Sequence, residues 1–366
     1  MATTLFPRHA ARPAPPVSGG ALTWLRTNLF AGWSSGLTTV VLVLLAVYGF
    51  SAFFDWAVFR AVFRPDADAC RAAGAGACWG MIAEKIRPLL FGRYPFEAQW
   101  RPALAILLML SLLVATCRRP QRPRRWFVVW TAALATIFIL MAGGVFGLGP
   151  VPTARWGGLP LTLMLAIGGI AAAFPLGVLL ALGRRSTLPA VHTLCAVYIE
   201  ALRGIPLVSV LFLASFLFPL FLPPGTSVDV LLRVFAGLTL FAAAYLAEVV
   251  RGGLQSILRG QIEAAAALGL GYWQIQRRIV LPQAFAAVLP ALMNNFIGTL
   301  KDTSLVTVVG LYELTGALAM ALSGSPDWRP FYLEGYLFIG AIYWCLCFSL
   351  SRYSRRLEAS HPGKAK

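Results

Sequence analysis

Residues 260–282 read GQIEAAAALGLGYWQIQRRIVLP, and this stretch decides how the chain is interpreted. Its first half is rich in alanine, which predicts a short helix that stops where Gly269 or Gly271 adopts the left-handed conformation. Its second half predicts another short amphipathic helix, followed at Pro282 by a turn into a long apolar segment. The alanines leave one helix face nearly flat, so another protein surface could approach it closely.

The composition around this stretch excludes an ordinary soluble protein. Hydrophobic residues make up 58% of the 366 residues, charged residues only 12%, and the mean hydropathy is +0.74. Soluble domains carry about 25% charged residues, so much of this surface is suited to lipid. The sequence therefore predicts an all-α, polytopic membrane protein and excludes a disordered chain or a disulfide-stapled mini-protein.

About eight transmembrane helices are predicted. Crossing a hydrocarbon core of ~30 Å takes about 20 apolar residues. Stretches of this kind lie at 26–55, 101–118, 125–155, 155–184, 203–229, 229–251, 278–301 and 334–352.

The positive charges support this topology. With eight crossings both termini lie on one side, and the five segments on that side hold 20 of the 31 Lys and Arg residues. The opposite loop, 55–101, carries seven basic and five acidic residues and is nearly balanced. Positively charged short loops stay in the cytoplasm, so both termini are predicted to be cytoplasmic. The net charge of +17 is explained by topology, and no nucleic-acid partner is expected.

Two of the six cysteines, Cys70 and Cys78, fall in the loop predicted to be external. A disulfide between them is plausible in an oxidising compartment, and two free thiols are equally compatible with the sequence. The other four lie in or beside apolar spans, as buried thiols commonly do.

The sequence lacks the motifs of an enzyme. It has no phosphate-binding loop and no Gly-x-Ser-x-Gly turn, and its three histidines are isolated. No metal site, cofactor or catalytic residue is therefore expected.

The opening stretch resembles the EAA loop of ABC importer permeases. In that family Glu-Ala-Ala is followed by three residues, Gly, nine residues and Ile-x-Leu-Pro, and the match here is complete. The matching residues are Glu263, Ala264, Ala265, Gly269, Ile279, Leu281 and Pro282. The resemblance implies that the loop at 251–283 docks into a separate ATPase subunit, which binds and hydrolyses the ATP.

Three further segments resemble polar amino-acid uptake permeases, the histidine, glutamine and general L-amino-acid group. They are YIEALRGIPL at 198–207, AYLAEVVRGG at 244–253 and LKDTSL at 300–305. The first departs from the family pattern at Ile205, where threonine is usual. This resemblance covers 158–352 and implies a five-helix permease core.

The N-terminal part looks like the extension of broad-range L-amino-acid permeases, through CWG at 78–80 and FGRYP at 91–95. The predicted organisation therefore has four parts. They are a cytoplasmic tail at 1–36, an extension with three spans at 37–157, the permease core at 158–352, and a second cytoplasmic tail at 353–366.

Lys301 and Asp302 follow 22 residues without charge and fall within an apolar span. Ionisable residues inside the membrane are costly and usually mark substrate paths. Asn295, Thr299 and Asp302 recur with helical spacing and share one face, so these three and Lys301 are candidates for the translocation cavity. Alternatively, Lys301 reaches outward and Asp302 caps a break in the helix.

Two acid–arginine pairs, Glu200 with Arg203 and Glu248 with Arg251, lie near the predicted cytoplasmic boundary. Each pair is spaced to meet on a helix surface. They either stabilise helix ends or take part in gating or ATPase docking.

The resemblance implies a permease subunit, not an enzyme, that takes up L-amino acids across a bacterial inner membrane by alternating access. It implies an ATPase dimer, a second permease subunit and an external amino-acid-binding protein as partners. Three alternatives remain: an ABC permease for another small solute, an ion-coupled secondary transporter, and a membrane-embedded enzyme. The secondary transporter would need no docking loop and usually shows an inverted repeat, which the sequence does not clearly contain.

Overall fold

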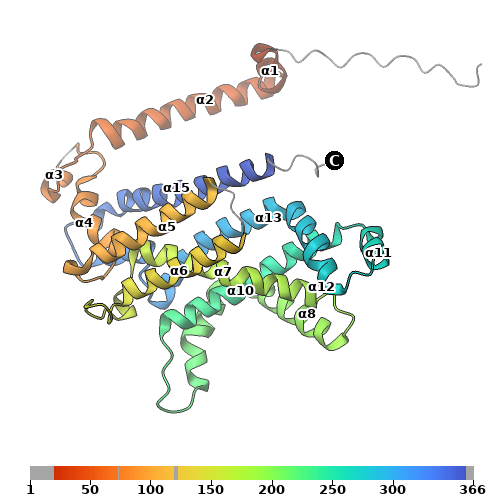
Figure 1. The fold of residues 1–366 in the computed structure, drawn as a ribbon. Coiled ribbons are helices and arrows are strands. Elements are labelled where there is room, and N and C mark those ends of the chain that lie inside the picture. The colour runs from red at the N-terminus through yellow and green to blue at the C-terminus, as the bar shows by residue number, and fades with distance from the viewer. Residues whose placement is uncertain (1–19, 73, 119–122, 360–366) are drawn as a thin grey trace, which may run out of the picture. The chain divides into compact units, whose positions relative to one another are not determined.

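The computed structural model describes residues 20–72, 74–118 and 123–359. In these ranges the chain is helical, and pairing between extended residues is limited to two isolated bridges (Figure 1). The predicted all-α class is confirmed. The α-helices are α1 (Ala21–Asn28), α2 (Trp33–Phe54), α3 (Ala67–Arg71), α4 (Gly80–Phe91), α5 (Trp100–Arg118), α6 (Pro123–Ala142), α7 (Gly158–Gly183), α8 (Pro189–Gly204), α9 (Leu207–Phe212), α10 (Val230–Gln255), α11 (Arg259–Ala267), α12 (Tyr272–Ile275), α13 (Leu281–Asp302), α14 (Leu314–Ser323) and α15 (Tyr332–Ala359).

The described residues contain seven helical segments long and apolar enough to cross a membrane, and an eighth if one bent pair counts as a span. This agrees with the eight predicted crossings. The seven segments are 33–59, 96–118, 125–142, 158–183, 230–255, 272–309 and 329–359.

The predicted span at 203–229 is the one that differs in shape. It is preceded by α8, and the chain then turns by 107° before α9 and the short turns η4 (Leu213–Leu217) and η5 (Phe218–Phe221). The bend lies at Ile205, whose backbone is extended because Pro206 disfavours a helical conformation in the residue before it. The absence of charged residues predicted that this segment is apolar, but it did not predict that the helix is broken.

The first of two compact units comprises 1–63 and 68–78, of which the described part begins at residue 20. Its helix α2 has no buried residue within this chain. Helix α1 falls inside the segment predicted as a tail, and residues 1–19 of that tail lie outside the described residues.

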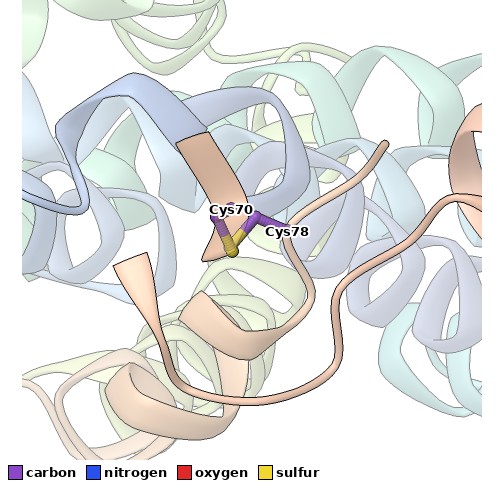
Figure 2. Close-up of a disulfide and its surroundings, with 2 residues drawn as sticks. All are labelled: Cys70 and Cys78. Atoms are coloured by element: carbon purple, nitrogen blue, oxygen red, sulfur yellow. A yellow bond between two sulfur atoms is a disulfide. The ribbon is translucent and has the colours of Figure 1, made fainter. Parts of the chain in front are cut away.

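A disulfide joins Cys70 to Cys78 in this unit (Figure 2), with the two Cα atoms 5.5 Å apart. The loop around it is held by backbone hydrogen bonds from Gly76 N to Arg60 O (2.7 Å) and from Ala77 N to Trp56 O (2.8 Å). Both cysteines are buried. The bridge therefore joins α3 to the segment that precedes α4 in the sequence.

The disulfide predicts the alkylation of the intact, denatured chain. Four cysteines are free in the structure, so maleimide without reductant should add four labels, and six after reduction. Mass spectrometry of the labelled chain measures the number directly. Six labels without prior reduction would contradict the bridge.

The second unit comprises 64–67 and 79–366, with helix α10 at its centre. In an apolar stretch of 18 residues within α10, 56% of the residues are buried. The corresponding share is at most 33% in the other six long apolar segments. Small residues permit the close packing: a Cβ on Gly177 of α7 would lie 2.9 Å from Leu246 Cβ, and one on Gly253 would lie 2.7 Å from Ala284 O of α13. Helices α7, α10 and α13 therefore form a tightly packed core.

The short helix α14 is anchored through Glu313, a fully buried acid that the sequence analysis did not single out. Its carboxylate caps α14 by accepting from two backbone N–H groups. It also accepts from the Thr162 hydroxyl of α7 (3.2 Å), from Thr307 (3.0 Å) and from the Tyr343 hydroxyl of α15 (2.8 Å). Since each oxygen has partners, this acid joins α7, α14 and α15 at one point.

Candidate functional site: an exposed loop, a membrane pocket and an ion network

The EAA-like loop forms an exposed elbow. Helix α11 ends at Ala267, and the chain reverses at Gly269, whose φ of +77° is the left-handed conformation that glycine adopts without strain. Of the two glycines proposed as the stop, Gly271 has an ordinary φ of −73°. Glu263, Ala264 and Gly269 are exposed, and Leu268 keeps 81% of its surface accessible.

The other side of the elbow is attached to the core. Ala265 is 3% exposed and packs in the cluster formed by α7, α10 and α13, together with the partly buried Ile279 and Leu281. The Gln283 side chain of α13 donates to the Gln261 side chain of α11 at 2.7 Å. One face of α11 is thus anchored to the core and to the start of α13, and the opposite face is free.

The turn predicted at Pro282 is not present. Helix α12 continues through the π turn η6 (Gln276–Val280) into α13, and Pro282 occupies its first turn. Proline is tolerated there because its missing N–H lies where the helical bonding pattern is already interrupted. The elbow is thus continuous with a long helix and is not hinged at this proline.

A pocket of about 370 Å³ opens between α9, α10 and α13. Asn295, Thr299 and Asp302 line it from α13, whereas Lys301 is exposed and is not among the lining residues. The complete lining is Leu207, Phe241, Ala242, Tyr245, Asn294, Asn295, Gly298, Thr299 and Asp302. The pocket thus combines two aromatic rings, amides and one carboxyl group, with no basic side chain.

The side chains of Asn295 and Thr299 form hydrogen bonds within α13 itself. Asn295 Nδ2 donates to Ala291 O at 3.0 Å, and the Thr299 hydroxyl donates to Asn295 O at 3.0 Å. The amide oxygen of Asn295 and the carboxylate of Asp302 therefore remain as acceptors beside the pocket. Phe241, Tyr245 and Asn294 were not predicted as pocket residues, although Tyr245 belongs to the family-like segment at 244–253.

The charged pairs predicted near the ends of α8 and α10 form one network. Glu248 pairs with Arg251, with Arg184 of α7 at 3.5 Å and with Arg203 of α8 at 3.6 Å. Glu200 pairs with Arg184 at 2.7 Å. Within the described residues, Arg203 thus forms an ion pair with Glu248 and not with Glu200, because α8 packs against α10.

This network reaches the pocket through Tyr245. The Arg203 guanidinium lies 5.8 Å from the centre of the Tyr245 ring, which lines the pocket. The neighbouring Arg185 donates to Leu254 O at 2.8 Å, a second link between α7 and α10. Neither Arg184 nor Arg185 was singled out from the sequence, because their partners lie 16 to 69 residues away.

Neutralising Glu248 should destabilise the network far more than neutralising Glu200. Glu248→Gln leaves three arginines without this partly buried carboxylate, 24% exposed, and we expect a cost of about 1–3 kcal/mol. Glu200→Gln removes a pair whose acid is 66% exposed, at a cost below ~1 kcal/mol. Thermal unfolding of the purified variants measures the difference, and equal midpoints would contradict this ranking.

The part of the chain that the structure describes contains no group of three or more His, Cys, Asp or Glu side chains placed to hold a metal ion. Outside the membrane-spanning segments, burial raises the pKa of Tyr94 above its usual range. Its neutral hydroxyl donates to Met141 O at 2.9 Å, which ties the FGRYP segment to α6.

The sequence is similar to known proteins along nearly its whole length. Residues 173–360 match the family described as the binding-protein-dependent transport system inner membrane component. The chain is 43% identical over 360 residues to the inner membrane amino-acid ABC transporter permease protein YhdY of Escherichia coli (strain K12), covering 97% of each chain. It is 35% identical over 429 residues to the glutamate/glutamine/aspartate/asparagine transport system permease protein BztC of Rhodobacter capsulatus, covering 98% of each.

Among solved structures, the chain is similar to one chain in the crystal structure of an amino acid ABC transporter with histidines. The identity is 31% and the TM-score 0.49, and the match covers 55% of this chain and 91% of that one.

Proposed function

Because the chain belongs to the family of binding-protein-dependent transport system inner membrane components, as the EAA-like loop predicted, we propose that it takes up amino acids. It is a multi-pass inner-membrane permease subunit of an ABC importer and not an enzyme. Such subunits work with a separate ATPase and a substrate-binding protein. Two relatives that match along nearly their whole length are named as amino-acid transport permeases, which supports this substrate class.

The exposed face of α11 is the docking surface for the ATPase in this proposal. Its residues Glu263 and Ala264 are accessible, while Ala265 holds the helix to the core. The surface of small side chains permits close approach, and the Gln261–Gln283 hydrogen bond connects α11 to α13. ATP-driven closure of an ATPase dimer would pull on α11 and thereby tilt α13, whose other end carries the pocket.

The pocket between α9, α10 and α13 is the substrate site in this proposal. A free amino acid carries an ammonium group and a carboxylate. Asp302 supplies the negative charge for the ammonium group. The rings of Tyr245 and Phe241 line the same pocket, and aromatic rings attract cations. The described lining holds no basic residue, so a second permease subunit, identical or paralogous, would complete the site and the pore.

The orientation in this proposal places α11 and both termini in the cytoplasm. The excess of Lys and Arg in the segments on that side supports this. An amino-acid-binding protein would deliver substrate to the opposite side. No cofactor is proposed for this chain, since ATP would be bound by its partner.

Reconstitution tests the proposal. The complete chain and its co-purified ATPase are placed in proteoliposomes with the binding protein outside and ATP inside, and uptake of a panel of labelled amino acids is measured. We expect uptake that requires ATP hydrolysis. Uptake driven by an ion gradient without ATP would favour a secondary transporter, and ATP-driven uptake of a different solute class would refute the amino-acid assignment.

A further inference from the structure

Helix α15 carries an aromatic strip that leads into a basic cluster at its C-terminal end. The rings of Trp344 and Phe348 are stacked, 5.1 Å apart and inclined by 16°, and 63% and 42% of these residues are exposed. Arg352 and Arg355 follow on the same side of the helix, within about 80° of Trp344 at 100° per residue. An exposed apolar strip ending in guanidinium groups matches the shape of a phospholipid, with an acyl chain followed by a phosphate.

The ends of two further helices bring more positive charge to this place. Arg356 of α15 lies within electrostatic range of the Cys117 thiol near the end of α5. The start of α6 is tied to the same end of α5, since Trp130 Nε1 donates to the Thr116 hydroxyl at 3.1 Å. Arg118 and Arg125 lie at the joined ends of α5 and α6. Together with the three arginines of α15 they are called the basic cluster: Arg118, Arg125, Arg352, Arg355 and Arg356.

This basic cluster is not compensated by acids. All five arginines are exposed, and within the described residues none of them has an ion-pair partner. The acid on the same turn of α15 is Glu358, which accepts a hydrogen bond from the Ser354 hydroxyl at 2.7 Å. Five guanidinium groups with one nearby acid keep a net positive charge that favours an external anion, and guanidinium groups bind phosphate oxygens in pairs.

The surroundings favour a lipid over a soluble anion. In the apolar stretch of 18 residues in α6, only 11% of the residues are buried. Phe127 and Val128 are exposed two and three residues after Arg125. The arginines thus lie at the boundary between apolar and polar surface, where phospholipid headgroups are found. Among the described residues, the extensive contacts of α11 are with α12 and η6 and not with α5 or α15, so the basic cluster is not packed on the proposed ATPase-docking helix.

We infer that the ends of α5, α6 and α15 form a binding site for an anionic phospholipid. The phosphate is held by Arg352, Arg355 and Arg356, and an acyl chain lies along Trp344 and Phe348. The inference requires only that the chain spans a membrane, so it stands or falls independently of the substrate and of the ATPase partner.

Native mass spectrometry of the purified complete chain tests this site. Phosphatidylglycerol and phosphatidylcholine with the same acyl chains are titrated separately, and the bound fractions are compared. We expect the wild type to prefer phosphatidylglycerol by at least tenfold. Each arginine near a membrane surface contributes about a fivefold change in affinity, so R352Q/R355Q/R356Q should lose at least tenfold in phosphatidylglycerol affinity.

The triple variant R64Q/R155Q/R329Q is the matched control, because it removes three exposed arginines from other loops and should keep the preference. W344A/F348A should weaken both lipids by a similar factor, since acyl contacts do not depend on the headgroup. Gel filtration shows whether each variant is folded.

Three results would overturn the inference. One is unchanged phosphatidylglycerol affinity in R352Q/R355Q/R356Q. Another is displacement of the lipid by millimolar inorganic phosphate, which would indicate a free-anion site. The third is an R352Q/R355Q/R356Q variant that still binds the lipid but no longer co-purifies with the ATPase. This result would make the basic cluster a protein-docking surface.

Discussion

The Glu263→Lys variant is expected to lose its ATPase partner while it keeps its fold. Glu263 is exposed on α11, so lysine causes no strain within the chain. At a docked interface, however, the reversed charge meets groups arranged for a carboxylate, and such a mismatch costs several kcal/mol. We expect at least a tenfold lower yield of ATPase on co-purification and a corresponding loss of substrate-stimulated ATP hydrolysis.

Two controls separate docking from stability. Glu97→Lys makes the same charge reversal at an exposed residue of another loop and should leave assembly unchanged. Gly269→Ala and Gly260→Ala both add a methyl group to open space, but only Gly269 has a positive φ. Gly269→Ala should therefore weaken coupling through strain of about 1 kcal/mol, and Gly260→Ala should not. Normal assembly and hydrolysis in Glu263→Lys would refute the docking surface.

The Asp302→Asn variant should assemble and hydrolyse ATP but transport poorly. Asp302 is the one carboxyl group among the residues that line the described pocket, and asparagine keeps its size while removing the charge. Loss of the charged partner of a substrate ammonium group costs about 2–5 kcal/mol, so we expect uptake in proteoliposomes to fall at least thirtyfold.

Two further variants test whether the charge of Asp302 is responsible for the loss of transport. Ser304→Ala alters a polar side chain two residues away that bonds to Lys301 O and does not line the pocket, and it should transport normally. Asp302→Glu keeps the charge and should recover part of the uptake. Full transport by Asp302→Asn with intact coupling would remove Asp302 from the substrate site.

The spans and the elbow illustrate what local sequence determines. Hydropathy over about 20 residues located seven of the spans, because the cost of placing charges in lipid applies to each segment separately. The glycine stop at Gly269 was predictable because a left-handed residue after an alanine-rich helix is a local requirement. The break at Ile205–Pro206 had a local signal in Pro206, but its angle of 107° depends on the packing of α8 and α9.

The ion network shows where local reasoning failed. Spacing paired Glu200 with Arg203, yet Arg184 of α7 binds Glu200, and Arg203 turns to Glu248 of α10. Helical spacing describes only one helix surface, whereas three helix ends converge here. The same limit hid Glu313, whose partners on α7 and α15 lie 151 and 30 residues away.

By itself the sequence determined the membrane class, the positions of the long apolar segments, the helical elbow and the family resemblance, because each depends on residue types within one short segment. Only the tertiary structure decided which helices surround Asp302, which arginines share Glu248, and that Glu313 joins α7, α14 and α15. These follow from helix packing, in which small residues such as Gly177 and Gly253 set how closely distant segments approach, and no single segment encodes that distance.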